Sequence, residues 1–495
     1  MTQSRISLSP IDADPVSVDT DCLVIGLMHA AALPGWAGSL NEATGGLLER
    51  LREAGELPTS AGRSLMLHEP DGLRARRLLI VGLGKPGKWT EHVYAAITRA
   101  AGQAVRASRA RSAHCLLPLL EVPGRDDAWK TFQAAIGMDH GDYVYTATRT
   151  PRDDDAPPTE SVTLPAIDGI DALLTRADAV NAGVRTARDL ADLPPNICTP
   201  AYLAERATQL AEEIDGLEVE VLEEDAMIEL GMNALMAVGK GSVNRPRLIR
   251  LRWTGGSGAP YALVGKGVTF DTGGISLKPR ELMEQMKFDM GGAAATIGAL
   301  EAVARMKLPL NVDGVVAAVE NMPDAGAYRP GDVITSMAGK TIEVHNTDAE
   351  GRMILADALT WTERNSKPAA MVDIATLTGA CVVALGHHAS GIMTRDDELA
   401  EELLTAGLEA SDRGWRLPLW DEYQKQIETP FADMKNIGGM PAGSITAGCF
   451  LSRFVEDTRW AHIDIAGSAW QWGKPESATG RPVGLLVRWL IDRAG

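Results

Sequence analysis

The chain has 495 residues, 45% of them hydrophobic, and a formal net charge of −18. This length predicts two to four domains with a large buried core. So acidic a chain argues against general nucleic-acid binding, which relies on a basic surface to displace counterions. The five cysteines include no CxxC pair, so we expect no thiolate metal site and a reducing, cytoplasmic compartment.

The start of the chain shows no export or membrane signal. Residues 1–15 lack a basic stretch followed by an apolar core, so we expect no signal peptide. The apolar run at residues 22–33 is too short to span a bilayer and is interrupted by His29. We therefore expect no membrane partner.

The first part of the chain predicts a small α/β domain. Residues 22–27 and 77–82 are short apolar runs typical of buried strands, and residues 94–111 carry Ala, Ile and Val at helical spacing. Residues 148–165 are rich in proline and acid, which is typical of a linker. We expect an N-terminal domain at residues 1–165 that serves oligomerisation or regulation.

Arginines are frequent in this first domain, at Arg74, Arg76, Arg77, Arg99, Arg106, Arg109 and Arg111. Runs of this kind are mostly solvated helix faces. They leave open a contact with nucleic acid through the N-terminal domain.

The remainder, residues 166–495, predicts a larger α/β domain that begins with a long helix at residues 167–193. Strands are predicted at residues 247–253, 261–265, 312–319, 370–375 and 462–465, and helices at residues 291–306 and 352–364. Long apolar strands with helical crossovers imply a mostly parallel central sheet covered by helices. Ligands of such sheets bind beyond the carboxyl ends of the strands.

Residues 346–352 (NTDAEGR) place two acids, Asp348 and Glu350, two positions apart. In an extended chain this spacing points both side chains to the same side. Gly351 permits a sharp turn, and Arg352 opens an apolar run that predicts a helix. Taken alone, the stretch is equally consistent with a capped helix start and a surface salt bridge.

A second charged stretch, residues 264–292, carries Lys266, Asp271, Lys278 and Asp289 among glycines and apolar residues. Buried acids cost several kcal/mol unless cations pair with them. The carboxylates of the two stretches outnumber the nearby lysines, and hard oxygen donors suit divalent ions such as Mg, Mn or Zn. Each residue alone is more often part of a structural ion pair than a metal ligand.

These two stretches, in this order and at this spacing, resemble the leucyl aminopeptidase family, the cytosol aminopeptidases or peptidase family M17. The similarity continues through residues 321–332, 375–380 and 460–467 and covers the chain from about residue 189 to near its end, while the first domain matches only loosely. The resemblance implies a metalloexopeptidase that releases N-terminal leucine and other apolar residues during intracellular peptide turnover. It also implies peptide substrates with a free N-terminus and a homo-hexamer.

The resemblance further implies a site for two divalent ions, Mn or Zn. The tighter ion would be held by Lys266, Asp271, Asp289 and Glu350, and the more exchangeable one by Asp271, Asp348 and Glu350. A lysine ligand must be neutral, so the pKa of Lys266 is expected to be strongly lowered by burial and the two ions. Lys278 would polarise the scissile carbonyl, and Arg352 would hold a bicarbonate ion that acts as general base.

The family pattern also assigns residues to the substrate's first side chain: Met286, Thr376, Leu377, Gly379 and Ala466. Ala469 stands where better-known relatives carry methionine, which would enlarge the pocket. Met286 could equally be an ordinary core methionine.

Two other functions stay open on the sequence alone. A DNA-binding accessory role through the arginine-rich first domain is one, since some bacterial relatives have such a role. A carboxylate-metal phosphatase is the other, although it would need more cationic phosphate ligands than Lys278 and Arg352 supply.

Overall fold

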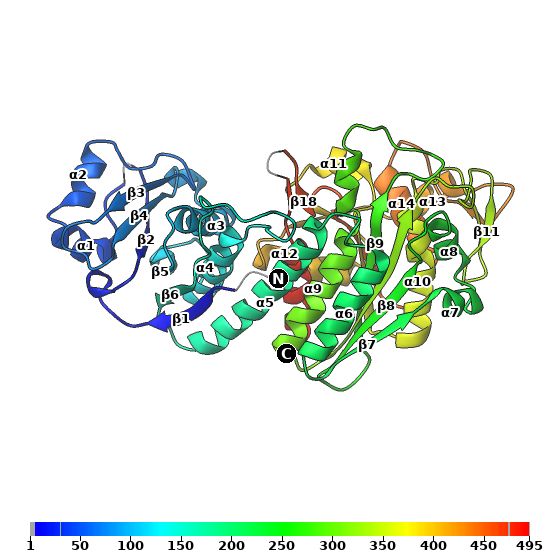
Figure 1. Ribbon diagram of the computed structural model, residues 1–495, viewed down its shortest axis with the longest axis horizontal. Coiled ribbons are helices and arrows are strands. Elements are labelled where there is room, and N and C mark those ends of the chain that lie inside the picture. The colour runs from blue at the N-terminus through cyan, green and yellow to red at the C-terminus, as the bar shows by residue number, and fades with distance from the viewer. Residues whose placement is uncertain (1–4, 30, 474–475, 495) are drawn as a thin grey trace. The chain divides into compact units, whose positions relative to one another are not determined.

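The computed structural model describes residues 5–29, 31–473 and 476–494 (Figure 1). Residues 1–4 lie outside the described residues; they belong to the segment 1–15, for which no signal peptide is expected. The chain divides into two units, Met1–Asn181 and Ala182–Gly495, and the division falls within helix α5 (Ile170–Asp192). Each unit is built on its own α/β sheet, so the predicted two-domain α/β fold is confirmed.

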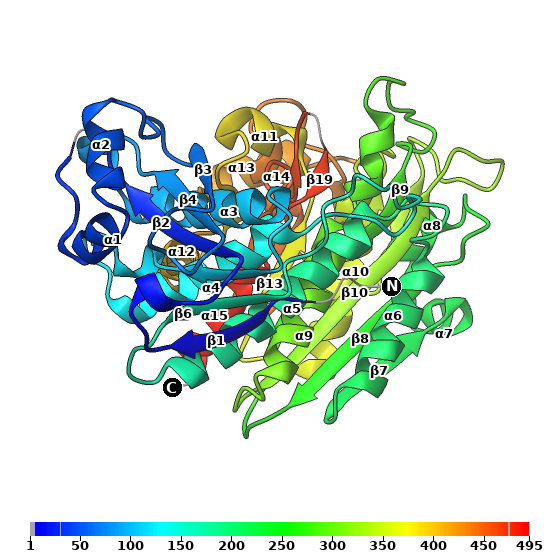
Figure 2. The same ribbon diagram turned by 60° about the vertical axis from the view of Figure 1, so that its left-hand side comes forward.

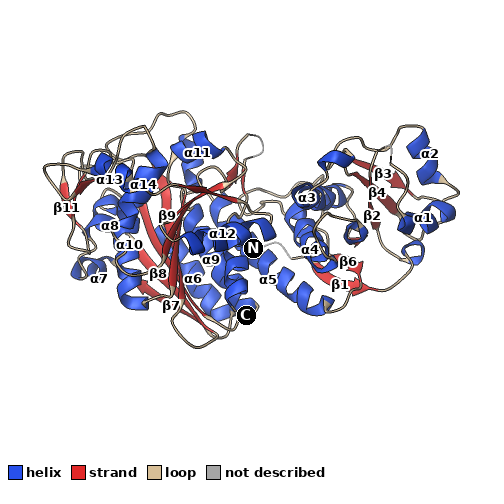
Figure 3. Ribbon diagram, turned by 180° about the vertical axis from the view of Figure 1, so that it is seen from behind, coloured by secondary structure: helices blue, strands red, loops and turns tan. Residues whose placement is uncertain are grey.

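The smaller unit has a six-stranded sheet in the order β1-β6-β5-β2-β4-β3, parallel except for β3 against β4 (Figure 3). Its strands are β1 (Ser7–Ile11), β2 (Cys22–Leu27), β3 (Ser64–His68), β4 (Arg77–Gly82), β5 (Ser112–Cys115) and β6 (Ser161–Pro165). Strand β6 lies inside the predicted linker, because Val162 and Leu164 alternate inward and are fully buried.

Helices cover both faces of this sheet and enclose two apolar clusters. They are α1 (Gly38–Ala43) and α2 (Leu47–Glu53) on one face, and α3 (Glu91–Ala107) and α4 (Asp127–Asp142) on the other. The arginines noted in the sequence meet acids here: Arg106 contacts the buried Asp142 at 3.2 Å, and Arg111 pairs with Glu160.

The larger unit has an eight-stranded mixed sheet in the order β15-β14-β17-β13-β9-β10-β8-β7. The strands are β7 (Leu217–Leu222), β8 (Arg247–Thr254), β9 (Tyr261–Asp271), β10 (Asn311–Asn321), β13 (Ala370–Ala375), β14 (Ser390–Met393), β15 (Gly414–Leu417) and β17 (Trp460–Asp464). The four central strands β17, β13, β9 and β10 are parallel as predicted, whereas β14, β8 and β7 add antiparallel pairings.

Helices again cover both faces of the sheet (Figure 2). One face carries α6 (Pro200–Glu213), α9 (Gly291–Arg305), α12 (Asp397–Glu409) and α15 (Val483–Arg493), and the other α8 (Asn233–Gly239), α10 (Glu350–Ser366) and α14 (Gly443–Ser452). In the part of the chain that the structure describes, no helix is both long and apolar enough to cross a membrane. All five cysteines are buried thiols.

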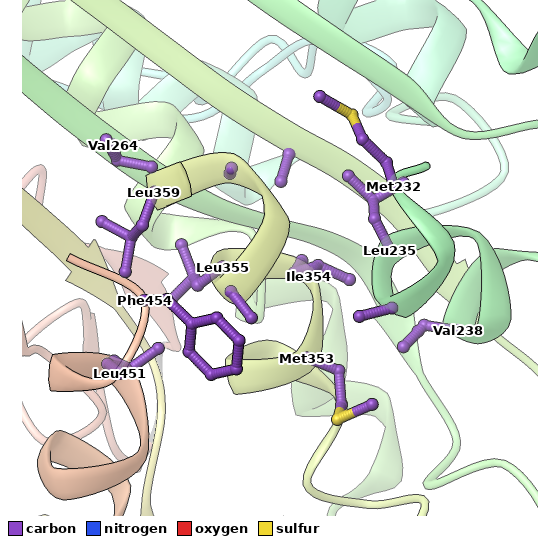
Figure 4. Close-up of a cluster of buried hydrophobic side chains, with 14 of the residues drawn as sticks. Met232, Leu235, Val238, Val264, Met353, Ile354, Leu355, Leu359, Leu451 and Phe454 are labelled. Carbon is purple, nitrogen blue, oxygen red and sulfur yellow. The ribbon is translucent and has the colours of Figure 1, made fainter. Parts of the chain in front are cut away.

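Helix α10 is the best-buried helix that carries a predicted site residue. Figure 4 shows its residues Ile354 and Leu355 packed between Leu235 of α8 and Phe454, which follows α14. Every residue from Glu350 to Thr362 is buried. The first turn of α10, with Glu350 and Arg352, is therefore anchored in the core.

A buried ion pair joins the neighbouring strands β13 and β17. His462 Nδ1 lies 2.5 Å from Asp373 Oδ1, and Trp460 Nε1 donates to Asp373 Oδ2 at 2.8 Å. Burial disfavours the charged imidazole, but the carboxylates of Asp373 and Asp464 outweigh it and raise the pKa of His462. Because the folded-state pKa is the higher one, this pair stabilises the unit fully below about pH 6.5, and the stabilisation is lost as the pH rises through the folded-state pKa.

We expect Asp373→Asn to lower the free energy of unfolding of the larger unit by about 1 to 3 kcal/mol at pH 6, and by less at pH 9. Urea unfolding at the two pH values measures this difference. Asp313→Asn is the matched control, because the buried Asp313 pairs with Arg250 and Arg252, whose guanidinium groups stay charged throughout this range. Equal losses for Asp373→Asn at both pH values would contradict the expectation.

Candidate metal centre

The predicted metal ligands come from three segments of the larger unit. Strand β9 carries Lys266 in its middle and Asp271 at its carboxyl end. Asp289 directly follows the short helix η5 (Met283–Phe288), two residues before α9 begins. Asp348 lies in a turn, and Glu350 is the first residue of α10. The extended conformation assumed for residues 346–350 is therefore wrong, since the helix already begins at Glu350.

These segments bring the Lys266 amine against two of the acids. Its Nζ lies 2.9 Å from Asp289 Oδ1 and 2.8 Å from Glu350 Oε1. It also donates to the carbonyl of Thr376 at 2.8 Å. The predicted convergence of Lys266 and Glu350 is thus observed.

The second lysine lies on the other side of the same cluster. Lys278 Nζ lies 2.8 Å from Asp271 Oδ2 and also contacts Asp348 Oδ1. Asp271, Asp348 and Glu350 each offer one carboxylate oxygen, and these oxygens lie within 4.8 Å of one another. Among the described residues this is the one group of His, Cys, Asp and Glu side chains with metal-binding spacing.

The electrostatics of the cluster favour added cations. Burial and the neighbouring carboxylates raise the pKa values of Asp271 and Asp289, and burial and Asp271 raise that of Asp348 to about 7. Asp289 Oδ2 is buried and has no hydrogen-bond partner within the described residues. Four acids facing two lysines, with a buried oxygen of Asp289 left without a hydrogen bond, form a donor set that fits divalent ions.

The protein groups alone do not lower the pKa of Lys266, and the lowering expected from the sequence depends on two bound ions. Burial opposes its charge, but the carboxylates of Asp289, Glu350 and Asp271 outweigh burial and raise its pKa. The protein groups alone therefore favour an ammonium here, and only bound cations could reverse the balance.

Arg352 follows Gly351 in α10 and is buried, and one of its N–H groups lacks an acceptor among the described residues. Its Nη1 donates to the carbonyl of Asn436 at 2.8 Å, while its Nε has no hydrogen-bond partner among the described residues. Burial lowers its pKa to about 10, still far above neutrality, so the guanidinium stays charged. A buried cation with a free N–H group fits a small anion.

The predicted substrate residues are brought together in part. Thr376 Oγ1 donates to Asp289 Oδ1 at 2.8 Å, so Thr376 lies directly beside the acids. The amides of Leu377 and Ala466 donate to the same Asp464 oxygen, at 3.2 and 3.0 Å. Ala469 lies near Thr376, because a Cβ atom built on Gly291 would be 3.2 Å from Ala469 Cβ and 3.4 Å from Thr376 Cγ2.

The other two predicted substrate residues, Met286 and Gly379, make no side-chain hydrogen bond to Asp289 or Asp464 in the part of the chain that the structure describes. Met286 is half-buried in η5, and its carbonyl accepts a hydrogen bond from the Asp289 amide at 3.3 Å. Gly379 is exposed at the start of α11 (Gly379–Leu385).

Sequence reasoning missed several polar residues that support the cluster. Asn321 Nδ2 donates to Asp271 Oδ1 at 2.8 Å, and Tyr328 donates to the carbonyl of Thr347 at 2.8 Å. Asn436 accepts from Arg352. Asn321 could have been found, since it opens one of the stretches that carry the resemblance, residues 321–332. Nothing local to Asn436 indicates its role.

Comparisons with known proteins agree with this site. The cytosol aminopeptidase family's catalytic-domain model matches residues 185–487, and its N-terminal-domain model matches residues 24–152. A probable cytosol aminopeptidase of Xylella fastidiosa (strain M23) is 53% identical over 97% of this chain and 98% of its own length. One from Stenotrophomonas maltophilia (strain K279a) is 54% identical over 96% of each chain.

Solved structures show the same fold. A mutant of tomato leucine aminopeptidase superposes with a TM-score of 0.89 at 34% identity, covering 99% of this chain and 97% of that one. The bottromycin maturation enzyme BotP in complex with Mn has a TM-score of 0.84 at 34% identity, covering 96% of this chain and 100% of that one.

Fold, site and relatives together define a hydrolase, an aminopeptidase. The chain belongs to the cytosol aminopeptidase family. The resemblance stated from the sequence is confirmed, and it extends to the first domain, which the sequence matched only loosely. Use of a divalent metal is supported by the family and by the Mn-bound BotP structure.

Proposed function

We propose that the protein is a leucyl aminopeptidase that removes N-terminal leucine and other apolar residues from peptides in the cytoplasm, with two divalent ions, Mn or Zn. The observation that carries this proposal is one cluster of charged side chains: the buried Lys266 amine contacts two acids, and one of these lies close to two more. Peptide turnover is the role we propose for this activity.

The chain's residues divide between two ion positions. Lys266, Asp271, Asp289 and Glu350 would hold the tighter ion, and Asp271, Asp348 and Glu350 the more exchangeable one. Bound there, the ions supply Lewis acidity, which lowers the pKa of water and provides a place for a free α-amine. Lys266 must lose its proton to serve as a ligand, and the carboxylates must stay ionised.

Two cationic side chains complete the chemistry. Lys278 keeps its charge at the edge of the acid cluster, where it would stabilise the negative charge that develops on the scissile carbonyl oxygen. Arg352 would hold a bicarbonate ion through its free Nε–H group, and that ion would supply a general base.

The substrate's first side chain would lie against Met286, Thr376, Leu377, Gly379 and Ala466, of which Thr376 lies directly beside Asp289. A blocked N-terminus would exclude a peptide, since acylation delocalises the nitrogen lone pair into the new carbonyl group. We further propose that the N-terminal domain (residues 1–165) serves assembly of a homo-hexamer. No specific observation favours the DNA-binding or phosphatase alternatives.

Hydrolysis of leucine p-nitroanilide tests the proposal, with N-acetyl-leucine p-nitroanilide as the matched substrate. We expect turnover of the first alone, lost on chelation and restored by Mn or Zn. Equal hydrolysis of both substrates, or full activity after chelation, would refute it.

A further inference from the structure

We propose that Asn321, Tyr328 and Thr347 are positioning residues that hold the Asp348 side of the centre, and that Tyr328 and Thr347 set ion affinity there independently of the Lys266 side. This inference rests on the proposed two-ion function and assigns residues to it that the sequence does not.

The peptide group between Thr347 and Asp348 is held at both ends. Its carbonyl oxygen accepts from Asn321 Nδ2 at 3.1 Å and from the Tyr328 hydroxyl at 2.8 Å. Its N–H group donates to Asn346 Oδ1 at 2.8 Å. Because a peptide group is planar, holding both its oxygen and its N–H group fixes its orientation and thereby the direction in which Asp348 leaves the chain.

The Thr347 side chain ties the same turn to the loop that carries Lys278. Its Oγ1 donates to the carbonyl of Gly273 at 2.6 Å and accepts from the Ser276 amide at 2.8 Å. Ser276 Oγ in turn accepts from the Thr347 amide at 3.2 Å. Lys278 and Asp348, which touch each other, are therefore held by one network.

Asn321 connects this network to Asp271. Its Nδ2 donates to Asp271 Oδ1 at 2.8 Å, and its carbonyl accepts from Thr272 Oγ1 at 2.8 Å. Asn321 and Tyr328 are each 1% exposed, so water cannot replace a bond that either of them loses. Asp348 differs from them in exposure: its side chain is 31% exposed, so burial does not hold it in place.

The Lys266 side has different supports. Thr376 of the segment after β13 accepts from Lys266 Nζ through its carbonyl and donates to Asp289 through its hydroxyl, both at 2.8 Å. Asn321, by contrast, comes from β10, and Tyr328 and Thr347 come from the segments between β10 and α10. Tyr328 and Thr347 bond the Asp348 turn and Thr376 bonds Lys266 and Asp289, whereas Asn321 also bonds Asp271, which both ion positions would share. A change at Tyr328 or Thr347 should therefore leave the other ion in place.

The test is a Mn²⁺ titration of the full chain after a chelator has removed its metal. Calorimetry and the Mn²⁺ electron paramagnetic resonance signal measure how many ions bind and how tightly. Tyr328→Phe removes one hydroxyl bond and Thr347→Val removes the two bonds of its hydroxyl, each with little change in shape, and Thr376→Val is the matched variant on the other side. We expect wild type to bind two ions per chain. Tyr328→Phe and Thr347→Val should each weaken one ion by about 10- to 100-fold, the same ion that Asp348→Asn weakens. Thr376→Val should weaken the other.

The outcomes separate this inference from the function on which it rests. Two bound ions in wild type, with both affinities unchanged or equally reduced in Tyr328→Phe and Thr347→Val, would overturn the inference alone. Fewer than two ions in wild type would refute the proposed function. Thermal unfolding of each metal-free variant shows whether a loss is local, and similar small decreases in melting temperature for Tyr328→Phe, Thr347→Val and Thr376→Val are the expected result, because each loses a buried hydroxyl.

Discussion

Lys278→Ala is expected to lower kcat by about 10²- to 10³-fold while both ions still bind. A single preorganised donor at a developing oxyanion contributes this much to turnover. Lys278 also lies against Asp271 and Asp348, so its removal takes a positive charge away from two proposed ligands. Ion affinity should therefore stay the same or rise. Turnover of leucine p-nitroanilide and the metal content of the purified variant measure the two effects.

Lys287→Ala is the matched control for this substitution. Lys287 lies over the Phe288 ring at 4.7 Å and donates to the carbonyl of Asp192, outside the acid cluster. It should keep near-normal turnover. An unchanged kcat in Lys278→Ala, or a loss of metal that accounts for the fall, would contradict the role assigned to Lys278.

Gly351→Ala is expected to abolish most activity without harming the fold. A Cβ atom at Gly351 would lie 2.7 Å from Lys266 Cδ and Cε and 2.8 Å from Lys266 Nζ. The Lys266 side chain would have to move, and its amine would leave Asp289 and Glu350. Displacing a reacting group by about 1 Å can cost about 10²-fold in rate. Alanine is favoured over glycine inside helices, so α10 itself should not be weakened.

Turnover, Mn²⁺ affinity and melting temperature of Gly351→Ala check this expectation. Gly484→Ala in α15 is the control, since a Cβ atom there meets its nearest neighbour at an ordinary 3.6 Å. It should match wild type in all three measurements. Normal turnover in Gly351→Ala would show that the position of the Lys266 amine is not critical.

Local patterns predicted the sheet but not where its functional strand ends. The apolar run that predicts a strand at residues 261–265 stops at Lys266, whereas β9 continues to Asp271. The Lys266 charge interrupts the apolar pattern, but Asp289 and Glu350 pair with it in the folded chain. The residues next to Lys266 in the sequence do not indicate this pairing. The strands at residues 22–27 and 370–375 carry no such charge at their ends, and their predicted bounds are correct.

The charged residues of the site were predictable, but most of their supports were not. Two dense motifs identified Lys266, Asp271, Asp289, Asp348 and Glu350 as a set. Their geometry depends on single polar residues such as Asn436, whose contact with Arg352 spans 84 positions. An isolated asparagine carries no periodicity or spacing, so only the folded chain shows which group it meets.

Anomalous diffraction from crystals grown with Mn²⁺ tests the central claim most directly. The account predicts two peaks about 3 to 4 Å apart, one bound by Lys266 and Asp289 and the other by Asp348, with Asp271 and Glu350 touching both. An active enzyme whose crystals show no peak at these side chains would contradict it.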